Sequence, residues 1–258
     1  MNIGIIGAGA IATYMMETIG EHKEWNMHVQ SVFVRDKEKY AELASAHGVT
    51  LYTDIDAFLQ SDIDIVVEAA NVQAVKTLLP TVLEKKSAVV ISIGALVEAT
   101  FLTEIKQLAK QSNHHLYLPS GAIGGLDVIQ HAKATNNLST VALETRKPAH
   151  TLVEEPIEQE QIVFQGTAAA AIKAFPKNIN VAIALGLAGV GMEETNVTMI
   201  ADSQVDRNIH RIKATGGFGN MSFQIENAPM PSNANTSYLA AMSVIGTLQN
   251  SERHFHLG

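Results

Sequence analysis

The sequence predicts an α/β protein in two parts: an N-terminal doubly wound parallel sheet, and a smaller α+β domain whose sheet is mainly antiparallel. Up to residue 119, short apolar segments alternate with helical patterns, which is the order found in parallel sheets with right-handed crossovers. After that point several strand-like segments follow one another with fewer helices between them. We therefore expect domains at residues 1–119 and 120–232, and a C-terminal segment, residues 233–258, whose helix returns to the first domain.

The chain begins with a strand, a glycine-rich turn and a helix. Residues 3–6 form an apolar run, and a helical pattern starts at residue 10. The turn between them reads Gly7-x-Gly9-x-x-Ala12, the G-x-G-x-x-G/A pattern of dinucleotide-binding Rossmann units. Other α/β proteins also have glycine-rich turns, but here strand, turn and helix come in the required order. The residues expected to contact a cofactor in this turn are Gly7, Gly9, Ala10 and Ile11.

Further strands and helices complete the first part. Residues 27–34 alternate and are rich in β-branched side chains, whereas residues 63–70 and 87–93 are nearly continuous apolar runs, as in strands covered on both faces. Together, the expected strands are residues 27–34, 49–54, 63–70, 87–93 and 115–119, and the expected helices are residues 37–47, 56–61, 72–85 and 102–111.

The second part starts with a glycine-rich segment that leads into a helix near residue 126. The polar stretch 233–236 offers good N-cap residues for a last helix. The expected strands are residues 138–145, 161–165, 194–202, 207–215 and 220–226, and the expected helices are residues 167–175, 180–187 and 237–249.

Composition excludes several classes of protein. The net charge of −8 over 258 residues argues against a general nucleic-acid binder, and the absence of cysteine excludes disulfides and thiolate chemistry. No apolar run is long enough to span a membrane, and no secretory signal is visible, so we expect a cytoplasmic protein. The pairs His114-His115 and His254-x-His256 lack a third ligand at suitable spacing, so we expect no metal site.

Three segments resemble the signatures of the L-aspartate dehydrogenase family: residues 119–127 (PSGAIGGLD), 175–182 (FPKNINVA) and 208–212 (NIHRI). The tail at residues 226–229 and 233–237 is also similar, and the resemblance covers essentially the whole chain. It implies a homodimer that interconverts L-aspartate with oxaloacetate and ammonia, using NAD or NADP. The product, or the iminoaspartate that precedes it, can feed NAD biosynthesis. By analogy, the exposed face of the second-domain sheet is the expected dimer interface.

The resemblance also selects site residues. Oxidation of an amino acid requires a group that exchanges protons near neutrality, and among ten histidines the resemblance selects His210 as that catalytic group. On a strand, Asn208, His210 and Ile212 share one face. The resemblance implies that Ala122 and Asn180 contact the cofactor. Asn178 and Ser120 are candidates for binding substrate, although helix capping is an equally ordinary role for an asparagine at a helix start.

A dicarboxylate substrate also needs cations or clustered N–H donors. The candidate N–H donors are Gly121 and Gly124, near Ser120. The candidate cations are Lys177, Arg207, Arg211 and Lys213. Strand alternation puts Arg207, Arg211 and Lys213 on the face opposite His210, so we expect these three to be solvated charges instead.

The residues after the second strand bear on cofactor choice. NAD-specific folds commonly place an acidic residue at the end of this strand, whereas here Val34 is followed by Arg35 and then Asp36. An arginine can pair with a 2′-phosphate or stack on adenine. We therefore expect Arg35 to contact the cofactor, and NADP to be accepted at least as well as NAD.

Two other functions remain open. One is a different Rossmann-fold reductase acting on a small carboxylate or a sugar, and the other is an NAD(P)-binding sensor without turnover. The related sugar dehydrogenases carry Glu-Lys-Pro directly after the fifth strand, whereas here Ser92-Ile93-Gly94 follows it. That difference disfavours the sugar enzymes.

Overall fold

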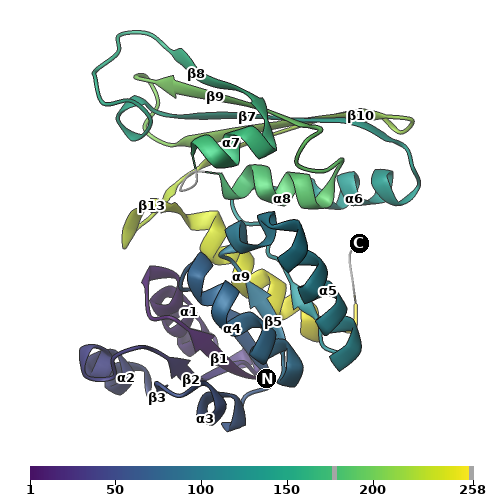
Figure 1. Ribbon diagram of the computed structural model, residues 1–258. Helices are drawn as coiled ribbons and strands as arrows, with labels where there is room; N and C mark the ends of the chain where they lie inside the picture. The colour runs from purple at the N-terminus through teal and green to yellow at the C-terminus, as the bar shows by residue number, and fades with distance from the viewer. Residues whose placement is uncertain (176–178, 256–258) are drawn as a thin grey trace. The chain divides into compact units, whose positions relative to one another are not determined.

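The computed structural model describes residues 1–175 and 179–255. Contacts divide the chain into two compact units (Figure 1). Of the described residues, the first unit holds Met1–Pro119 together with residues 241–255, and the second holds Ser120–Ala240. Among the described residues, no helix has the length and apolar character needed to cross a bilayer.

The first unit is built on a six-stranded sheet in the order β3-β2-β1-β4-β5-β6. Every neighbouring pair in it is parallel, which confirms the predicted doubly wound arrangement. The strands are β1 (Asn2–Ile6), β2 (His28–Phe33), β3 (Thr50–Tyr52), β4 (Ile65–Glu68), β5 (Ser87–Val90) and β6 (Leu116–Tyr117).

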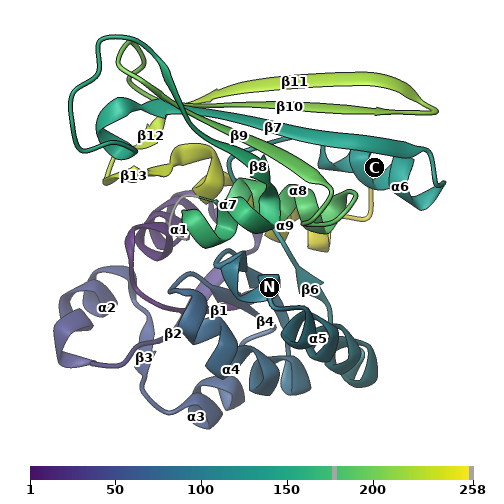
Figure 2. The same cartoon turned by 45° about the horizontal axis from the view of Figure 1, so that its top comes forward.

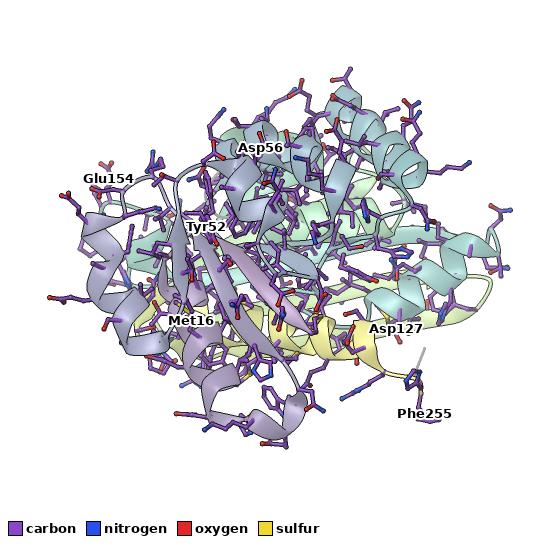
Figure 3. All side chains as sticks on the ribbon, turned by 90° about the horizontal axis from the view of Figure 1, so that it is seen from below. Met16, Tyr52, Asp56, Asp127, Glu154 and Phe255 are labelled. Carbon is purple, nitrogen blue, oxygen red and sulfur yellow. The ribbon has the colours of Figure 1, made fainter. Side chains whose placement is uncertain are left out.

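Helices cover both faces of this sheet because its strands are apolar on both sides. One core joins Ile3 and Ile5 to Met16, a residue labelled in Figure 3, and to Val244 near the C-terminus. A second core lies on the other face around Ile6. The helices of the unit are α1 (Ala10–Glu21), α2 (Ala41–His47), α3 (Ile55–Gln60), α4 (Val72–Lys85), α5 (Ala99–Ser112) and α9 (Tyr238–Glu252), which starts in the second unit.

Two segments of the first unit differ from the prediction. The helix expected over residues 37–47 is a short 3-10 turn, Glu38–Tyr40, followed by α2. The strand expected to end at residue 93 ends at Val90, and Ile93–Val97 forms another 3-10 turn. Ile93, Ala95 and Leu96 are buried in this turn, so the apolar run reflects burial and not a longer strand.

The second unit carries a five-stranded sheet in the order β11-β10-β7-β9-β8. Its neighbours are antiparallel except for the parallel pair β7–β9, so the prediction of a mainly antiparallel sheet is confirmed. Helices α6, α7 and α8 lie along one face of the sheet (Figure 2). The bounds are α6 (Leu126–Ala134), β7 (Leu138–Pro148), β8 (Gln161–Thr167), α7 (Ala168–Ala174), α8 (Asn180–Ala188), β9 (Thr195–Asp202), β10 (Asn208–Gly216) and β11 (Gly219–Asn227).

The polar stretch before α9 forms a strand. It is β13 (Asn233–Ser237), which pairs antiparallel with β12 (Pro229–Met230). The N–H of Tyr238 donates to the carbonyl of Ala228 at 2.9 Å, which closes the small hairpin. The backbone of this stretch is therefore paired as a strand up to the start of α9.

Candidate active site

The glycine-rich turn of the first unit has the geometry that its sequence predicts. Gly7 follows β1 with a φ of 103°, in the left-handed region that favours glycine. A Cβ there would lie 2.8 Å from the carbonyl oxygen of Ala69, closer than real contacts allow. The N–H of Gly7 donates to the carbonyl of Phe33 at 3.0 Å and anchors the turn to β2. Both the conformation and the space therefore require glycine.

The N-terminus of α1 is open. Gly9 precedes the helix, and no side chain caps it. Apart from Gly9 and its two neighbours in the chain, no heavy atom lies within 4 Å of the position that a Cβ of Gly9 would take. Ala10 and Ile11 open the first turn, while Ala12 is fully buried against the sheet. Uncapped N–H groups, the positive end of the helix dipole and free space above Gly9 together fit a pyrophosphate.

The end of β2 presents a cation. Val34 is buried and its N–H donates to the carbonyl of Tyr52 at 2.8 Å (Tyr52 is labelled in Figure 3), so the next side chain leaves the sheet. That side chain is Arg35, which is exposed. Asp36 accepts the N–H groups of Glu38 and Lys39 through one carboxylate oxygen, at 3.0 and 3.2 Å, and so caps the following turn.

A buried carboxylate that the sequence prediction missed lies at the end of β4. Glu68 is 3% exposed and accepts the N–H of Ala70 at 2.8 Å, and the N–H and hydroxyl of Ser92 at 3.0 and 2.9 Å. Burial raises the pKa of Glu68 even though these donors oppose the shift. The carboxylate thereby ties together the loops that leave β4 and β5 at the carboxyl edge of the sheet. An acidic residue at the end of an apolar strand is the signal that could have identified it.

In the second unit, His210 lies on the face of the sheet that α6, α7 and α8 cover, which we call the His210 face. Its side chain is 4% exposed, and Nδ1 shares a hydrogen bond of 3.1 Å with the hydroxyl of Thr145 on β7. That bond fixes the orientation of the ring and leaves Nε2 as the ring nitrogen that can exchange a proton with a ligand. Burial, and to a smaller extent the charge of Lys147, lower the pKa of His210 to about 4, so the imidazole is neutral at pH 7.

Lys147 is a second buried titratable group on this face. It follows Thr145 by two residues on β7, so both side chains point to the same side of the strand. Lys147 is 8% exposed, and burial lowers its pKa to about 8. The sequence prediction missed this residue. The alternation along β7 could have identified it, because Lys147 falls in the same alternating series as Leu143 and Thr145, whose side chains are buried.

The cations that the sequence did suggest face elsewhere. Arg207 pairs with the neighbouring Asp206 at 2.7 Å. Arg211 donates to Gln224 at 2.7 Å and lies 3.4 Å from Glu144, while Lys213 is exposed. Arg211 and Lys213 occupy the face of the sheet opposite His210, as the alternation predicts.

The loop of residues 120–125 is held by a polar contact to β11. Asn227 is 4% exposed, and its Nδ2 donates to the carbonyl of Ala122 at 3.0 Å. Ser237 in turn donates to Oδ1 of Asn227 at 2.6 Å. Gly121 precedes this contact with a φ of 64°, and Ser120 is half-buried at the start of the loop. The position of the Ala122 backbone is thus set by β11 and β13.

Asn180 is the exposed first residue of α8, a helix whose other positions are mostly buried. Its amide therefore lies at the helix start, in reach of a ligand that approaches that end. Asn178 and Lys177 lie outside the described residues.

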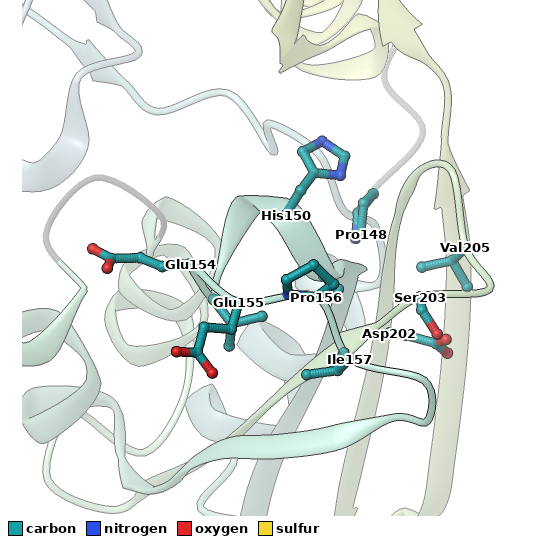
Figure 4. Close-up of a pocket in the computed structure, with 11 residues that line it drawn as sticks. Pro148, His150, Glu154, Glu155, Pro156, Ile157, Asp202, Ser203 and Val205 are labelled. Atoms are coloured by element: carbon teal, nitrogen blue, oxygen red, sulfur yellow. The ribbon is translucent and has the colours of Figure 1, made fainter.

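A separate pocket of about 420 Å³ contains none of the predicted site residues (Figure 4). His150, Glu154 and Glu155 line it from the loop after β7, and Asp202 and Ser203 line it from the end of β9. Within the described part of the chain, no group of three or more histidine and acidic side chains is arranged to hold a metal ion.

Comparison with known proteins gives consistent matches over both units. Residues 127–251 match the family model "Aspartate dehydrogenase, C-terminal", and residues 7–119 match "Homoserine dehydrogenase, NAD binding domain". An L-aspartate dehydrogenase of Methanosarcina barkeri is 39% identical over 264 residues, covering 96% of each chain. One of Methanospirillum hungatei is 36% identical, covering 100% of this chain and 99% of its own. The crystal structure of an aspartate dehydrogenase from Thermotoga maritima superposes with a TM-score of 0.83 at 32% identity, over 100% and 99% of the two chains.

Proposed function

The chain belongs to the L-aspartate dehydrogenase family, and on that premise we propose that it oxidises L-aspartate to iminoaspartate with NAD or NADP. Water then converts the imine to oxaloacetate and ammonia. Two electrons and a proton leave Cα together, and a second proton leaves the nitrogen as the C=N bond forms. The reverse sequence is the reductive amination of oxaloacetate.

The observation that carries this proposal within the site is the state of His210. A histidine that is buried, neutral at pH 7 and bound at Nδ1 to Thr145 offers Nε2 as a proton acceptor. In the proposed oxidation, Nε2 of His210 receives the proton from the substrate amine and returns it to the imine nitrogen. Neutral again, His210 accepts a proton from the water that attacks the iminium carbon. The carboxylates of bound L-aspartate bring negative charge, which raises the pKa of His210 toward the range in which it exchanges protons efficiently.

The residues of the first unit fit the cofactor. We assign the pyrophosphate to the uncapped N-terminus of α1 at Gly9, Ala10 and Ile11, with Gly7 shaping the turn. Arg35 is assigned to the adenosine ribose, where its charge suits a 2′-phosphate. When bound, the nicotinamide supplies the chemistry of accepting a hydride from Cα.

In the second unit, we assign Ala122 and Asn180 to cofactor contacts and Ser120 and Asn178 to the substrate. Asn227 supports the assignment of Ala122, because its side-chain amide fixes the carbonyl of that residue. We further propose that the protein is a cytoplasmic homodimer that binds neither nucleic acid nor membranes, and that its product feeds NAD biosynthesis.

The test is an assay of cofactor reduction by absorbance, with L-aspartate and either NAD or NADP. L-glutamate, L-alanine, homoserine and glucose serve as competing substrates. Turnover confined to L-aspartate, and reduced about 10²- to 10⁴-fold in His210→Ala with cofactor affinity unchanged, supports the reaction and the role of His210. Preferred turnover of homoserine or glucose, or cofactor binding without any turnover, would contradict it.

A further inference from the structure

A dicarboxylate substrate that is oxidised next to His210 needs a cation on the same face of the sheet. The five strands β7–β11 carry four cationic side chains: Arg146, Lys147, Arg211 and Lys213. Three of them lie on the opposite face. Arg146 pairs there with Glu160 and Asp202, Arg211 contacts Glu144, and Lys213 is exposed. Lys147 is the cation of this sheet on the His210 face.

The surroundings of Lys147 form a polar end to an otherwise apolar face. Leu143 and Ile212 are buried in the middle of the face. Toward the end of the sheet they give way to Thr145 and Lys147 on β7 and to Asn208 and His210 on β10. In the next strand, Asn227 is the register partner of Asn208 and holds the carbonyl of Ala122. Polar side chains from three strands and the loop of residues 120–125 therefore come together beside His210.

We propose that the ammonium group of Lys147 binds a carboxylate of the substrate beside His210. This inference rests on the function proposed above. It identifies Lys147 as the residue that makes the site specific for a substrate with a carboxylate. An ammonium group at 8% exposure has lost much of its hydration, and a carboxylate in the same site forms a charge-assisted contact with it.

The arrangement also couples substrate binding to acid–base chemistry. The positive charge of Lys147 lowers the pKa of His210 and thereby helps to keep the imidazole neutral before substrate arrives. When a carboxylate neutralises that charge, His210 becomes a stronger base at the moment when the amine must lose its proton.

The test compares Lys147→Met with a matched control, Lys213→Met, which removes the same charge from an exposed position on the opposite face. Steady-state kinetics are measured with L-aspartate, and NADH affinity is measured by fluorescence. We expect Lys147→Met to raise KM for L-aspartate about 10- to 100-fold with unchanged NADH affinity and a normal thermal melt. Lys147→Arg, which keeps the charge, should recover part of the loss, and Lys213→Met should behave as the wild type.

A second measurement does not depend on turnover. Calorimetric titration of the NADH complex with succinate, a dicarboxylate that cannot be oxidised at an amine, reports carboxylate binding directly. We expect binding to the wild type and to Lys213→Met, and at least tenfold weaker binding to Lys147→Met. If the wild type fails to oxidise L-aspartate but this difference remains, the proposed function is wrong and the carboxylate site stands.

Three results would overturn the inference while leaving the proposed function intact. One is an unchanged KM and unchanged succinate affinity in Lys147→Met. Another is a lower kcat, at unchanged KM, with loss of the alkaline limb of the pH profile, which would make Lys147 a proton donor. The last is a lower kcat, at unchanged KM, with a shift of the acidic limb alone, which would make it a group that only tunes His210.

Discussion

At the scale of single residues, the neutrality of His210 has a consequence for stability. Its pKa is 6.5 in the absence of the fold and about 4 in the folded chain, so the unfolded chain takes up the proton first as pH falls. The stability that depends on this histidine is therefore present above pH 6.5 and is lost between pH 6.5 and about 4.

We accordingly predict that unfolding free energy falls over this range in the wild type, by up to about 3 kcal/mol for this one group. His210→Asn should remove that part of the pH dependence. Urea denaturation at a series of pH values measures the unfolding free energy of each variant. The control is His28→Asn, because His28 is an exposed histidine on β2. Equal slopes in the wild type and His210→Asn would show that His210 is not held neutral by the fold.

A second prediction at this scale concerns Arg35. Its side chain is exposed directly after Val34, a buried residue just beyond the end of β2, and Asp36 accepts hydrogen bonds from the N–H groups of the next turn. Arg35→Ala should weaken NADPH about 10- to 100-fold through loss of a charge-assisted contact, and should change NADH affinity about twofold or less. Fluorescence titration with both cofactors measures this. A comparable loss for both would refute the role in 2′-phosphate recognition.

At the scale of elements, the β1–turn–α1 unit allows binding to be separated from folding. Gly9→Ala meets no neighbouring atom and keeps an ordinary φ, so its thermal midpoint should match that of the wild type. Its NAD(P) affinity should nevertheless fall at least tenfold, because a methyl group would occupy the space assigned to the pyrophosphate.

Gly7→Ala should lower both the midpoint and the affinity, since it adds a clash with Ala69 to the strain of a positive φ. Gly48→Ala is the control for strain alone, because Gly48 has a φ of 66° and open space around it. Calorimetric melts and NADH titrations of the three variants distinguish these cases. Undiminished NADH affinity in Gly9→Ala would place the pyrophosphate elsewhere.

The order of elements is predictable from local patterns because strands and helices here differ in length and periodicity. The site is predictable only where a motif is continuous in sequence, as in the glycine turn. Lys147 lies 63 positions before His210 in the sequence, and Thr145 lies 65 before it, so their proximity depends on the pairing of β7 with β10. Single-sequence patterns do not reveal which strands become neighbours. The same limit explains β13, where pairing with β12 decides the structure of a stretch that resembles a capping loop.

At the scale of the whole molecule, the proposed homodimer gives a fourth prediction. Ile162, Ile200 and Ile209 share the face opposite His210, and Ile162 is 59% exposed in the single chain. Light scattering after size exclusion should give twice the protomer mass of 27.7 kDa, about 55 kDa.

Ile162→Asp should shift this mass toward 27.7 kDa without lowering the melting temperature of the protomer, because the side chain is exposed there. Phe218→Asp, at an exposed position in the turn between β10 and β11, is the control and should remain dimeric. A single-protomer mass for the wild type would refute the homodimer, and a dimeric Ile162→Asp would exclude this face as its interface.

The first core combines residues that are synthesised at very different times. Val244, Ile245 and Leu248 of α9 share a core with Ile3, Ile5 and Met15. During synthesis, the strand and helix of the glycine turn are made long before the apolar residues of α9 that complete their core. A nascent chain therefore carries an unfinished nucleotide-binding unit until α9 has been synthesised. Loss of the C-terminal helix through a premature stop would consequently damage the N-terminal unit, although the two are more than 200 residues apart in the sequence.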